Sequence, residues 1–265
     1  MLKVTLDQII SALRAVGLQA GDGVMTHAAL QFLGLPEGGI GIYYAALRTV
    51  LGLDENLGTL VVPTFNFGFA RGEPFDQAET PAEEMGVFPE YVRRQPGVLR
   101  SPHPMQSVAA VGRHAADLCS RDTSSAFDPG SAFERMLELD FKLLLLGADV
   151  RFTSMVHLPE QRLQVPYRYW KEFTGEVRLH GQPHQVRTYR MYARDLDLDP
   201  DVDAAPVQRE LERRGLWTSI PLNYGRVAAC RLRDFVAVEE ELLRADPWAL
   251  VKNRPDRPPG QKKAA

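Results

Sequence analysis

Short apolar runs alternate with stretches of helical spacing along most of this chain, and this alternation most constrains its fold. Four runs have the length and composition of buried strands: 58–65, 107–112, 142–149 and 226–232. Helical patterns occur at 41–52, 114–120, 130–140 and 234–245. Because strands and helices alternate, we predict an α/β fold built around one sheet.

The last third of the chain has a different pattern. The stretch "GEVRLHGQPHQVRTYRMY" (175–192) predicts a hairpin with its turn at 181–183, and thus an antiparallel appendage to the sheet. The end of the chain, 253–265, is Pro-rich and charged, which predicts a disordered tail. We therefore expect a single domain over 1–252, and a homodimer is compatible with its scattered apolar surface.

Composition narrows the classes of function. The net charge of −3, without a basic stripe, argues against a nucleic-acid partner. No apolar run approaches the roughly 20 residues of a membrane helix, and the start lacks a signal-peptide core. Cys119 and Cys230 form neither a disulfide framework nor a zinc pattern, so we expect buried, reduced thiols in a cytoplasmic protein.

A histidine and a glutamate follow the apolar run at 142–149. His157 and Glu160 lie just past the predicted strand end, and on a helix their spacing puts both side chains on one face. A neutral imidazole beside a carboxylate suits proton abstraction at neutral pH. The same pair also suits a capped helix with a structural histidine, or two ligands of a metal. Spacing alone does not decide between these three interpretations.

The stretch "VLRSPHPMQS" (98–107) presents several donors on a stiff backbone, because its histidine stands between two prolines. The donors are Arg100, Ser101, His103 and Ser107. Such a set suits phosphate or carbonyl binding, and a Pro-rich surface turn is the alternative.

The stretch "MTHAALQFLG" (25–34) places a histidine at a strand end, followed by small residues. Its candidate residues are His27, Ala28, Ala29 and Leu30. Backbone N–H groups there can face a phosphate or an oxyanion, and close packing of small residues is the alternative.

Residues 66–106 form an unusually long connection with one short predicted helix, and such loops are usually functional. Within it, 72–94 is dense in carboxylates. Asp76, Glu79 and Glu90 can receive a cationic, polyamine-like substrate, and a solvated acidic loop is the alternative.

Together these stretches resemble the aminoglycoside 3-N-acetyltransferases, the antibiotic acetyltransferase family. The segments that carry the resemblance are "HAAL" (27–30), "GTLVVPTF" (58–65), "FD" (75–76), "TPAEEMG" (80–86), "RSPHPMQS" (100–107), "LLLLG" (143–147), "SMVHLPE" (154–160) and "VPYR" (165–168). They occur in the family's order, and the resemblance covers roughly residues 5–250. This ordered series is specific where one motif would be weak.

The resemblance implies a mixed sheet flanked by helices, with acetyl-CoA as donor and an amine as acceptor. It implies that His157 is the general base, that Glu160 orients or stabilises it, and that 27–30 and 100–107 hold the coenzyme. This sequence departs from the family where Ala28 and Ala29 replace two serines. Ser154, or Thr153 with a one-residue shift, stands at the motif threonine. Arg151 replaces the aspartate that many members place three residues before it, and Asp149 is a candidate substitute.

The chemistry expected from this set is a direct acyl transfer. His157 takes a proton from the acceptor amine, and donors near 27–30 or 101–103 meet the oxyanion. Neither cysteine lies in a motif, so we predict ternary-complex kinetics without a covalent intermediate. The alternatives are a non-catalytic ligand-binding member of the fold, a transferase with a different acyl donor, and a metal-dependent hydrolase using His27, His103 and His157. We favour a site without metal.

Overall fold

The centre of the protein is a seven-stranded mixed sheet, in a computed structural model that describes residues 2–83 and 85–254. In spatial order its strands are β11 (Thr218–Leu222), β12 (Gly225–Arg231), β8 (Lys142–Leu146), β2 (Gly23–Ala28), β4 (Thr59–Pro63), β7 (Val108–Gly112) and β6 (Leu99–Arg100). β8, β2 and β4 run parallel, and antiparallel strands flank them on both sides. All four predicted strands lie in this sheet, so the predicted α/β fold is confirmed.

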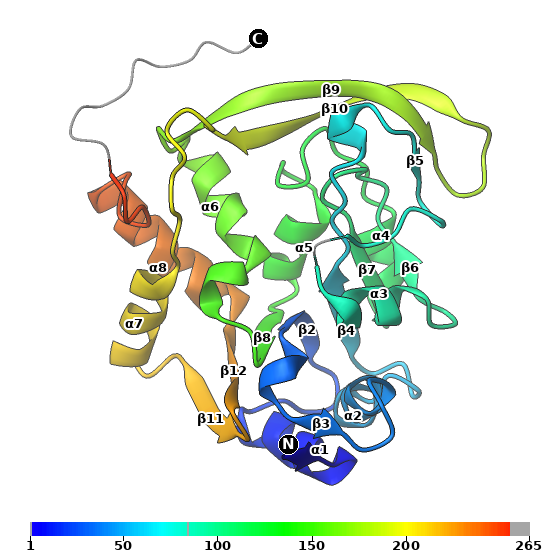
Figure 1. The fold of residues 1–265 in the computed structure, drawn as a ribbon, viewed down its shortest axis with the longest axis vertical. Coiled ribbons are helices and arrows are strands. Elements are labelled where there is room, and N and C mark those ends of the chain that lie inside the picture. The colour runs from blue at the N-terminus through cyan, green and yellow to red at the C-terminus, as the bar shows by residue number, and fades with distance from the viewer. Residues whose placement is uncertain (1, 84, 255–265) are drawn as a thin grey trace.

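Helices cover both faces of the sheet because its strands are apolar on both sides. In β8, Leu143 and Leu145 face one core cluster, while Leu144 and Leu146 face the other. The helices of the first cluster are α4 (Ala115–Cys119), α5 (Ala132–Glu138), α6 (His157–Arg162), α7 (Ala205–Arg213) and α8 (Leu232–Ala245). Those of the second are α1 (Leu6–Ala15), α2 (Gly41–Leu51) and α3 (Val87–Arg93). Figure 1 shows α7 beside α8, on the side of β8 away from α3.

The predicted hairpin is present and longer than expected. β9 (Arg168–Arg178) and β10 (Gln185–Arg194) pair antiparallel and arch over one end of the molecule (Figure 1). β5 (Phe75–Asp76), from the acidic loop, adds to β9 as a third, parallel strand. A small core of its own holds this layer down and includes Phe69, in η2 (Phe69–Arg71), and Tyr189. The long connection 66–106 is therefore tied to the hairpin.

Short elements complete the fold. β1 (Lys3–Val4) pairs with β3 (Leu35–Pro36), and three 3₁₀ turns are η1 (Leu30–Phe32), η3 (Val150–Phe152) and η4 (Ser154–Val156). Of the predicted tail 253–265, Asn253 bonds to the backbone at Asp199 and Asp201, and residues 255–265 lie outside the described residues. Over 2–83 and 85–254, every helix is too short or too polar to cross a membrane.

Candidate active site

His157 lies at the start of a helix that follows the carboxyl end of β8, as the sequence predicts. β8 ends at Leu146, and η3 and η4 follow before α6 begins at His157. β2 lies parallel to β8, with His27 opposite Leu145, so the carboxyl ends of both strands meet at one place. The two ends are joined by a hydrogen bond of 3.3 Å from the Ser154 N–H to Nε2 of His27.

His157 belongs to a charged triplet. Its Nδ1 lies 2.8 Å from Oε2 of Glu160, and Arg168 Nε lies 2.8 Å from that same oxygen. The His157 side chain is 29% exposed, while Glu160 is fully buried. Glu160 therefore connects an accessible imidazole to a guanidinium below it.

The electrostatics of the triplet favour a neutral histidine and an ionised glutamate. Burial lowers the pKa of His157, the nearby charge of Arg168 lowers it further, and Glu160 opposes both. Burial works to raise the pKa of Glu160, but Arg168 and His157 outweigh it and hold the pKa below its usual range. Nδ1 faces two groups, Oε2 of Glu160 at 2.8 Å and Nη2 of Arg168 at 3.2 Å. An ionised carboxylate only accepts hydrogen bonds, so the shorter contact favours the tautomer with the proton on Nδ1 and the lone pair on Nε2.

His27 has a structural part in this arrangement. Burial lowers its pKa to about 4, and the proximity of His157 contributes. It therefore stays neutral and accepts the Ser154 N–H. Asp149, the candidate substitute for the family aspartate, accepts the N–H of Arg151 at the start of η3.

A groove starts at the 27–30 turn. Its inner part is a cavity of about 260 Å³ lined by His27, Ala28, Ala29, Gln31, Pro63, Met85, Gly86, Pro89, Ala148 and Phe152. Leu30 packs against the core cluster behind the turn. The N–H of Ala29 donates to the Leu146 carbonyl at 2.9 Å, so it is already used within the fold.

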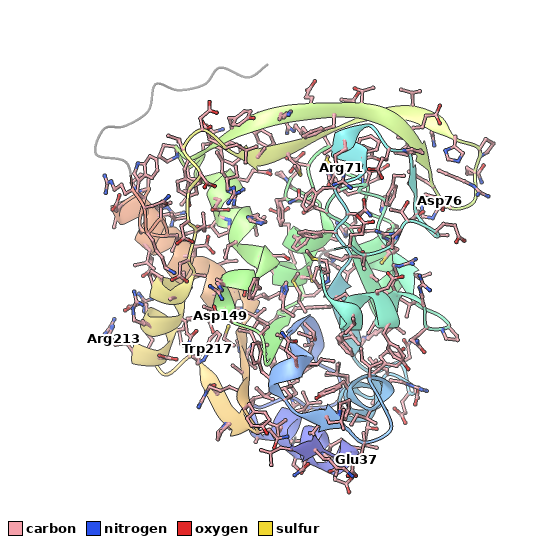
Figure 2. All side chains as sticks on the ribbon, viewed as in Figure 1. Glu37, Arg71, Asp76, Asp149, Arg213 and Trp217 are labelled. Atoms are coloured by element: carbon pink, nitrogen blue, oxygen red, sulfur yellow. The ribbon has the colours of Figure 1, made fainter. Side chains whose placement is uncertain are left out.

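The outer part of the groove is a larger cavity of about 540 Å³. It shares Ala29, Gln31, Ala148 and Phe152 with the inner part, so the two are continuous. Its remaining wall is rich in aromatic and cationic groups: Phe32, Arg151, Trp217, Tyr224 and Arg226. Figure 2 shows Trp217 and Asp149 at this end of the molecule, far from Asp76.

The segment 100–107 uses its donors to hold the long connection in place. Arg100 donates to the hydroxyl of Ser107 and to the carbonyls of Thr64, Gln77 and Thr80. Ser101 exchanges two hydrogen bonds with Val108. His103 accepts the Gln106 N–H, packs edge-on against Tyr189, and has its pKa lowered to about 4 by burial.

The three acidic residues of the loop have different surroundings. Asp76 accepts two backbone N–H groups and pairs with Arg178. Glu90 pairs with two arginines, and these contacts lower its pKa to about 2. Glu79 is exposed at the loop surface.

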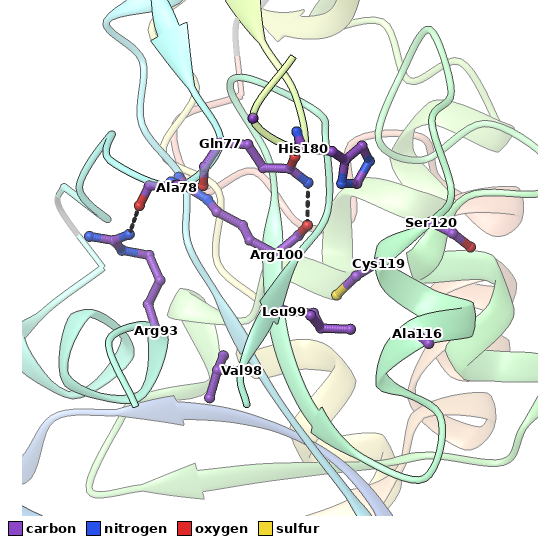
Figure 3. A pocket seen from close by; sticks show the side chains of 11 residues that line it. Gln77, Ala78, Arg93, Val98, Leu99, Arg100, Ala116, Cys119, Ser120 and His180 are labelled. Carbon is purple, nitrogen blue, oxygen red and sulfur yellow. Dashed lines mark hydrogen bonds between the residues drawn. The ribbon is translucent and has the colours of Figure 1, made fainter. Parts of the chain in front are cut away.

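A separate cavity of about 490 Å³ opens at the outer edge of the sheet beside β6 (Figure 3). Gln77 closes one side: it donates to the Arg100 carbonyl at 2.5 Å and accepts the His180 N–H at 2.8 Å. Cys119 lines the wall, and burial raises the pKa of its thiol to about 12. This cavity has no described lining residue in common with the groove at His27.

Both cysteines are free and buried, as predicted. Within the described residues, three or more His, Cys, Asp or Glu side chains do not come together in a way that could hold a metal ion. The hypothesis of a metal-dependent hydrolase needs His27, His103 and His157 around one ion, and the described residues do not support it.

Sequence patterns did not indicate several residues that lie near the site. Arg168 lies eleven positions after His157, beyond any helical spacing, and only its place in "VPYR" pointed to it. Phe127 packs edge-on against the His157 ring at 5.6 Å, and neighbouring Asp128 accepts from Gln161 of α6. Arg226 and Trp217 reach the groove from β11, β12 and the turn before them.

Comparison with known proteins shows the family to which the chain is similar. The family model described as aminoglycoside 3-N-acetyltransferase matches residues 25–244. Aminoglycoside N(3)-acetyltransferase III of Salmonella sp is 32% identical over 197 residues, covering 69% of this chain and 68% of its own. Aminoglycoside N(3)-acetyltransferase VIII of Streptomyces fradiae is 28% identical and covers 91% and 82%.

A solved structure extends the likeness over nearly the whole chain. Aminoglycoside acetyltransferase AAC(3)-IVa superposes with a TM-score of 0.76 in a complex with apramycin, at 27% identity, covering 94% of this chain and 96% of that one. The family match over most of the chain and the fold shared with AAC(3)-IVa together define its class. The chain belongs to the aminoglycoside 3-N-acetyltransferase family and is an N-acyltransferase.

Proposed function

We propose that this protein transfers an acetyl group from acetyl-CoA to an amine of an aminoglycoside or a related amino compound, with His157 as general base. The observation that carries the proposal is the 2.8 Å contact between His157 and Glu160. His157 acts electrostatically on His27, and His27 lines the inner cavity. A base with a fixed proton on Nδ1 presents its other nitrogen to an incoming amine.

The first chemical step is removal of a proton from the acceptor. An amine is mostly protonated at neutral pH and must lose a proton before it attacks a thioester. Nε2 of His157 accepts that proton as the nitrogen attacks, and Glu160 stabilises the imidazolium that forms. The amine–carbonyl bond forms and the carbon–sulfur bond breaks. The proton held by His157 goes to the departing thiolate, so the coenzyme leaves as its thiol, and the second proton lost by the nitrogen goes to solvent.

The groove suits a long anionic donor. Its inner part is narrow and mostly apolar, which fits the thioester end. Its outer part offers aromatic faces and the guanidinium groups of Arg151 and Arg226, which suit the base and phosphates of the coenzyme. Ala28 and Ala29 bring no hydroxyl to this groove, so we assign phosphate binding to the arginines.

We propose an indirect role in coenzyme binding for the segment 100–107. Its side chains hold 64–80 against the hairpin, and this fixes the chain that runs toward Met85 and Gly86 in the groove. We propose that Arg100, Ser101, His103 and Ser107 shape the donor site from behind.

The acidic loop is our proposed acceptor side. The AAC(3)-IVa structure holds apramycin, a polycationic compound, and an acceptor of that kind needs carboxylates that are still free. Among Asp76, Glu79 and Glu90, only Glu79 is exposed with its carboxylate outside the ion pairs of the described residues. We propose that Glu79 meets the acceptor while Asp76 and Glu90 shape the loop.

A direct transfer follows from the state of the cysteines. Burial raises the pKa of Cys119 to about 12 and that of Cys230 even further, so neither offers a thiolate at neutral pH. Initial rates measured over both substrates should give intersecting lines in double-reciprocal plots, as a ternary complex requires. Parallel lines would indicate an acyl-enzyme and contradict the direct transfer.

A transferase with a different acyl donor is the second candidate, because Ala28, Ala29 and the engaged Ala29 N–H all reduce the donors at the groove. Calorimetry with acetyl-CoA decides between them. Micromolar binding, about −8 kcal/mol, supports the first proposal. Binding seen only after Ala28→Ser and Ala29→Ser are combined supports the second.

A further inference from the structure

A second buried glutamate lies in the protein interior, near the His157–Glu160 pair. Glu239 on α8 is fully buried, at the centre of an apolar helix face. The other buried residues of that face are Leu232, Phe235, Val236 and Leu243. The next two residues after Glu239 are both paired with arginines: Glu240 with Arg162 of α6, and the exposed Glu241 with Arg214. A carboxyl group in such a position requires a partner.

Four buried oxygens in this region have no hydrogen-bond partner among the described residues. They are both carboxyl oxygens of Glu239, Oε1 of Glu160 and the hydroxyl of Tyr167. α6 packs against α8, and Tyr167 immediately precedes Arg168, which contacts Glu160. Glu160 and Glu239 both act to raise the pKa of the Tyr167 hydroxyl, so the three groups lie within electrostatic reach of one another.

The two carboxyl groups differ in protonation. Glu160 keeps its charge because His157 and Arg168 contact it directly. For Glu239, burial raises the pKa well above the usual value and the charge of Glu160 raises it further. Arg168 opposes this with a smaller effect, and Glu240 adds the smallest rise. The cations on the neighbouring helices, Arg162 and Arg214, are engaged with Glu240 and Glu241. Glu239 is fully buried without a hydrogen-bonded cation, whereas Glu160 has one, so Glu239 is the acid of the two.

We propose that Glu239 is a positioning residue, held protonated, whose O–H and the Tyr167 hydroxyl complete a hydrogen-bonded chain to the free oxygen of Glu160. With donors on Oε1, the carboxylate keeps Oε2 on Nδ1 of His157. The chain runs from Glu239 through Tyr167 to Glu160, directly or with one buried water, and ends at the base.

The test measures the pKa of the His157 imidazole by NMR titration, in the intact protein without substrate. Three variants are compared with the natural protein: Glu239→Gln, Glu239→Leu and Tyr167→Phe. Glu241→Gln is the matched control, because it makes the same change on the same helix at an exposed position.

Gln is neutral and keeps a donor, so Glu239→Gln should leave the His157 pKa within about 0.3 of the natural value. Leu removes the donor and makes Glu160 more basic, so Glu239→Leu should raise the His157 pKa and lower kcat roughly tenfold with little change in KM. Tyr167→Phe should act in the same direction as Leu.

A fall in the His157 pKa with Glu239→Gln would show that a negative charge was removed, and would overturn the protonated assignment. No change with Glu239→Leu would show that the side chain only fills space. If the Leu variant does not fold, Glu239→Gln and Tyr167→Phe still decide the matter. The kinetic arm rests on the proposed transferase function, whereas the titration does not, so failure of one is distinguishable from failure of the other.

Discussion

Glu90 and Glu160 are both carboxylates paired with arginine, and they differ in whether a carboxyl oxygen remains without a hydrogen-bond partner. Glu90 accepts from Arg93, Arg94 and the Ala82 N–H, which uses both oxygens in contacts within its own loop. Glu160 is more deeply buried, yet one oxygen serves His157 and Arg168 while the other lacks a partner. A carboxylate with every oxygen engaged holds a loop together, and one that shares its oxygen with an accessible histidine can assist chemistry.

The comparison also explains why a high density of carboxylates in the sequence did not locate the active site. The loop 72–94 holds many carboxylates, but Asp76 and Glu90 are paired with arginines. The carboxyl groups around the base lie singly in apolar surroundings on α6 and α8. The following changes test this contrast, from the largest expected effect to the smallest.

Replacing Arg168 by Gln should have the largest effect. The change removes a cation that lowers the pKa of His157, so that pKa rises and the protonated, inactive form extends to higher pH. The acid limb of the pH–rate profile should move upward, and kcat near pH 6 should fall roughly tenfold while the rate at pH 8 falls less. Arg178→Gln, which frees Asp76 at the hairpin, is the control. An acid limb that stays in place would show that Arg168 does not act on the base.

Replacing Arg151 or Arg226 by Ala should weaken donor binding without affecting the base. Loss of one guanidinium–phosphate contact should raise the KM for acetyl-CoA roughly tenfold. S-acetyl-pantetheine lacks the nucleotide, so its kinetics should not change. An equal loss with both donors would place these arginines outside the nucleotide end of the site.

Replacing Glu90 by Gln should have the smallest effect and a purely structural one. Its folded pKa of about 2 lies below the unfolded value, so its stabilising contribution is present above the unfolded pKa and is lost as the pH falls through about 2. Allowing for solvent screening, the variant should lose about 1 kcal/mol of unfolding free energy at pH 7 and progressively less in acid. Denaturant unfolding at several pH values measures this, and a raised acceptor KM would instead place Glu90 in the site.

The sequence predicted the sheet and the His157–Glu160 pair because both follow from local spacing. The four leucines Leu143 to Leu146 predict a strand that is buried on both faces. A separation of three residues along a helix puts Glu160 on the same face as His157. The pairing of β5 with β9 was beyond local patterns, since Phe75 meets Val177 about a hundred positions away. Glu239 stands in a run of three glutamates that resembles a solvated face, and only the packing of α8 shows which one points inward.

The same limit applies to the segment 100–107. Composition indicated a set of donors but not whether they were free, and the structure shows Arg100 engaged with four acceptors. Donor types can be read from a sequence, whereas their availability depends on long-range contacts.

The central claim is that His157 removes the proton from the acceptor amine, and one measurement tests it most directly. Release of coenzyme thiol from acetyl-CoA, with apramycin or gentamicin as acceptor, is followed for the natural protein and for His157→Ala, with His180→Ala as the exposed control. The account predicts acceptor-dependent release that falls about 10³-fold in His157→Ala, with unchanged acetyl-CoA affinity and an unaffected control. Acceptor-dependent release that survives in His157→Ala would contradict it.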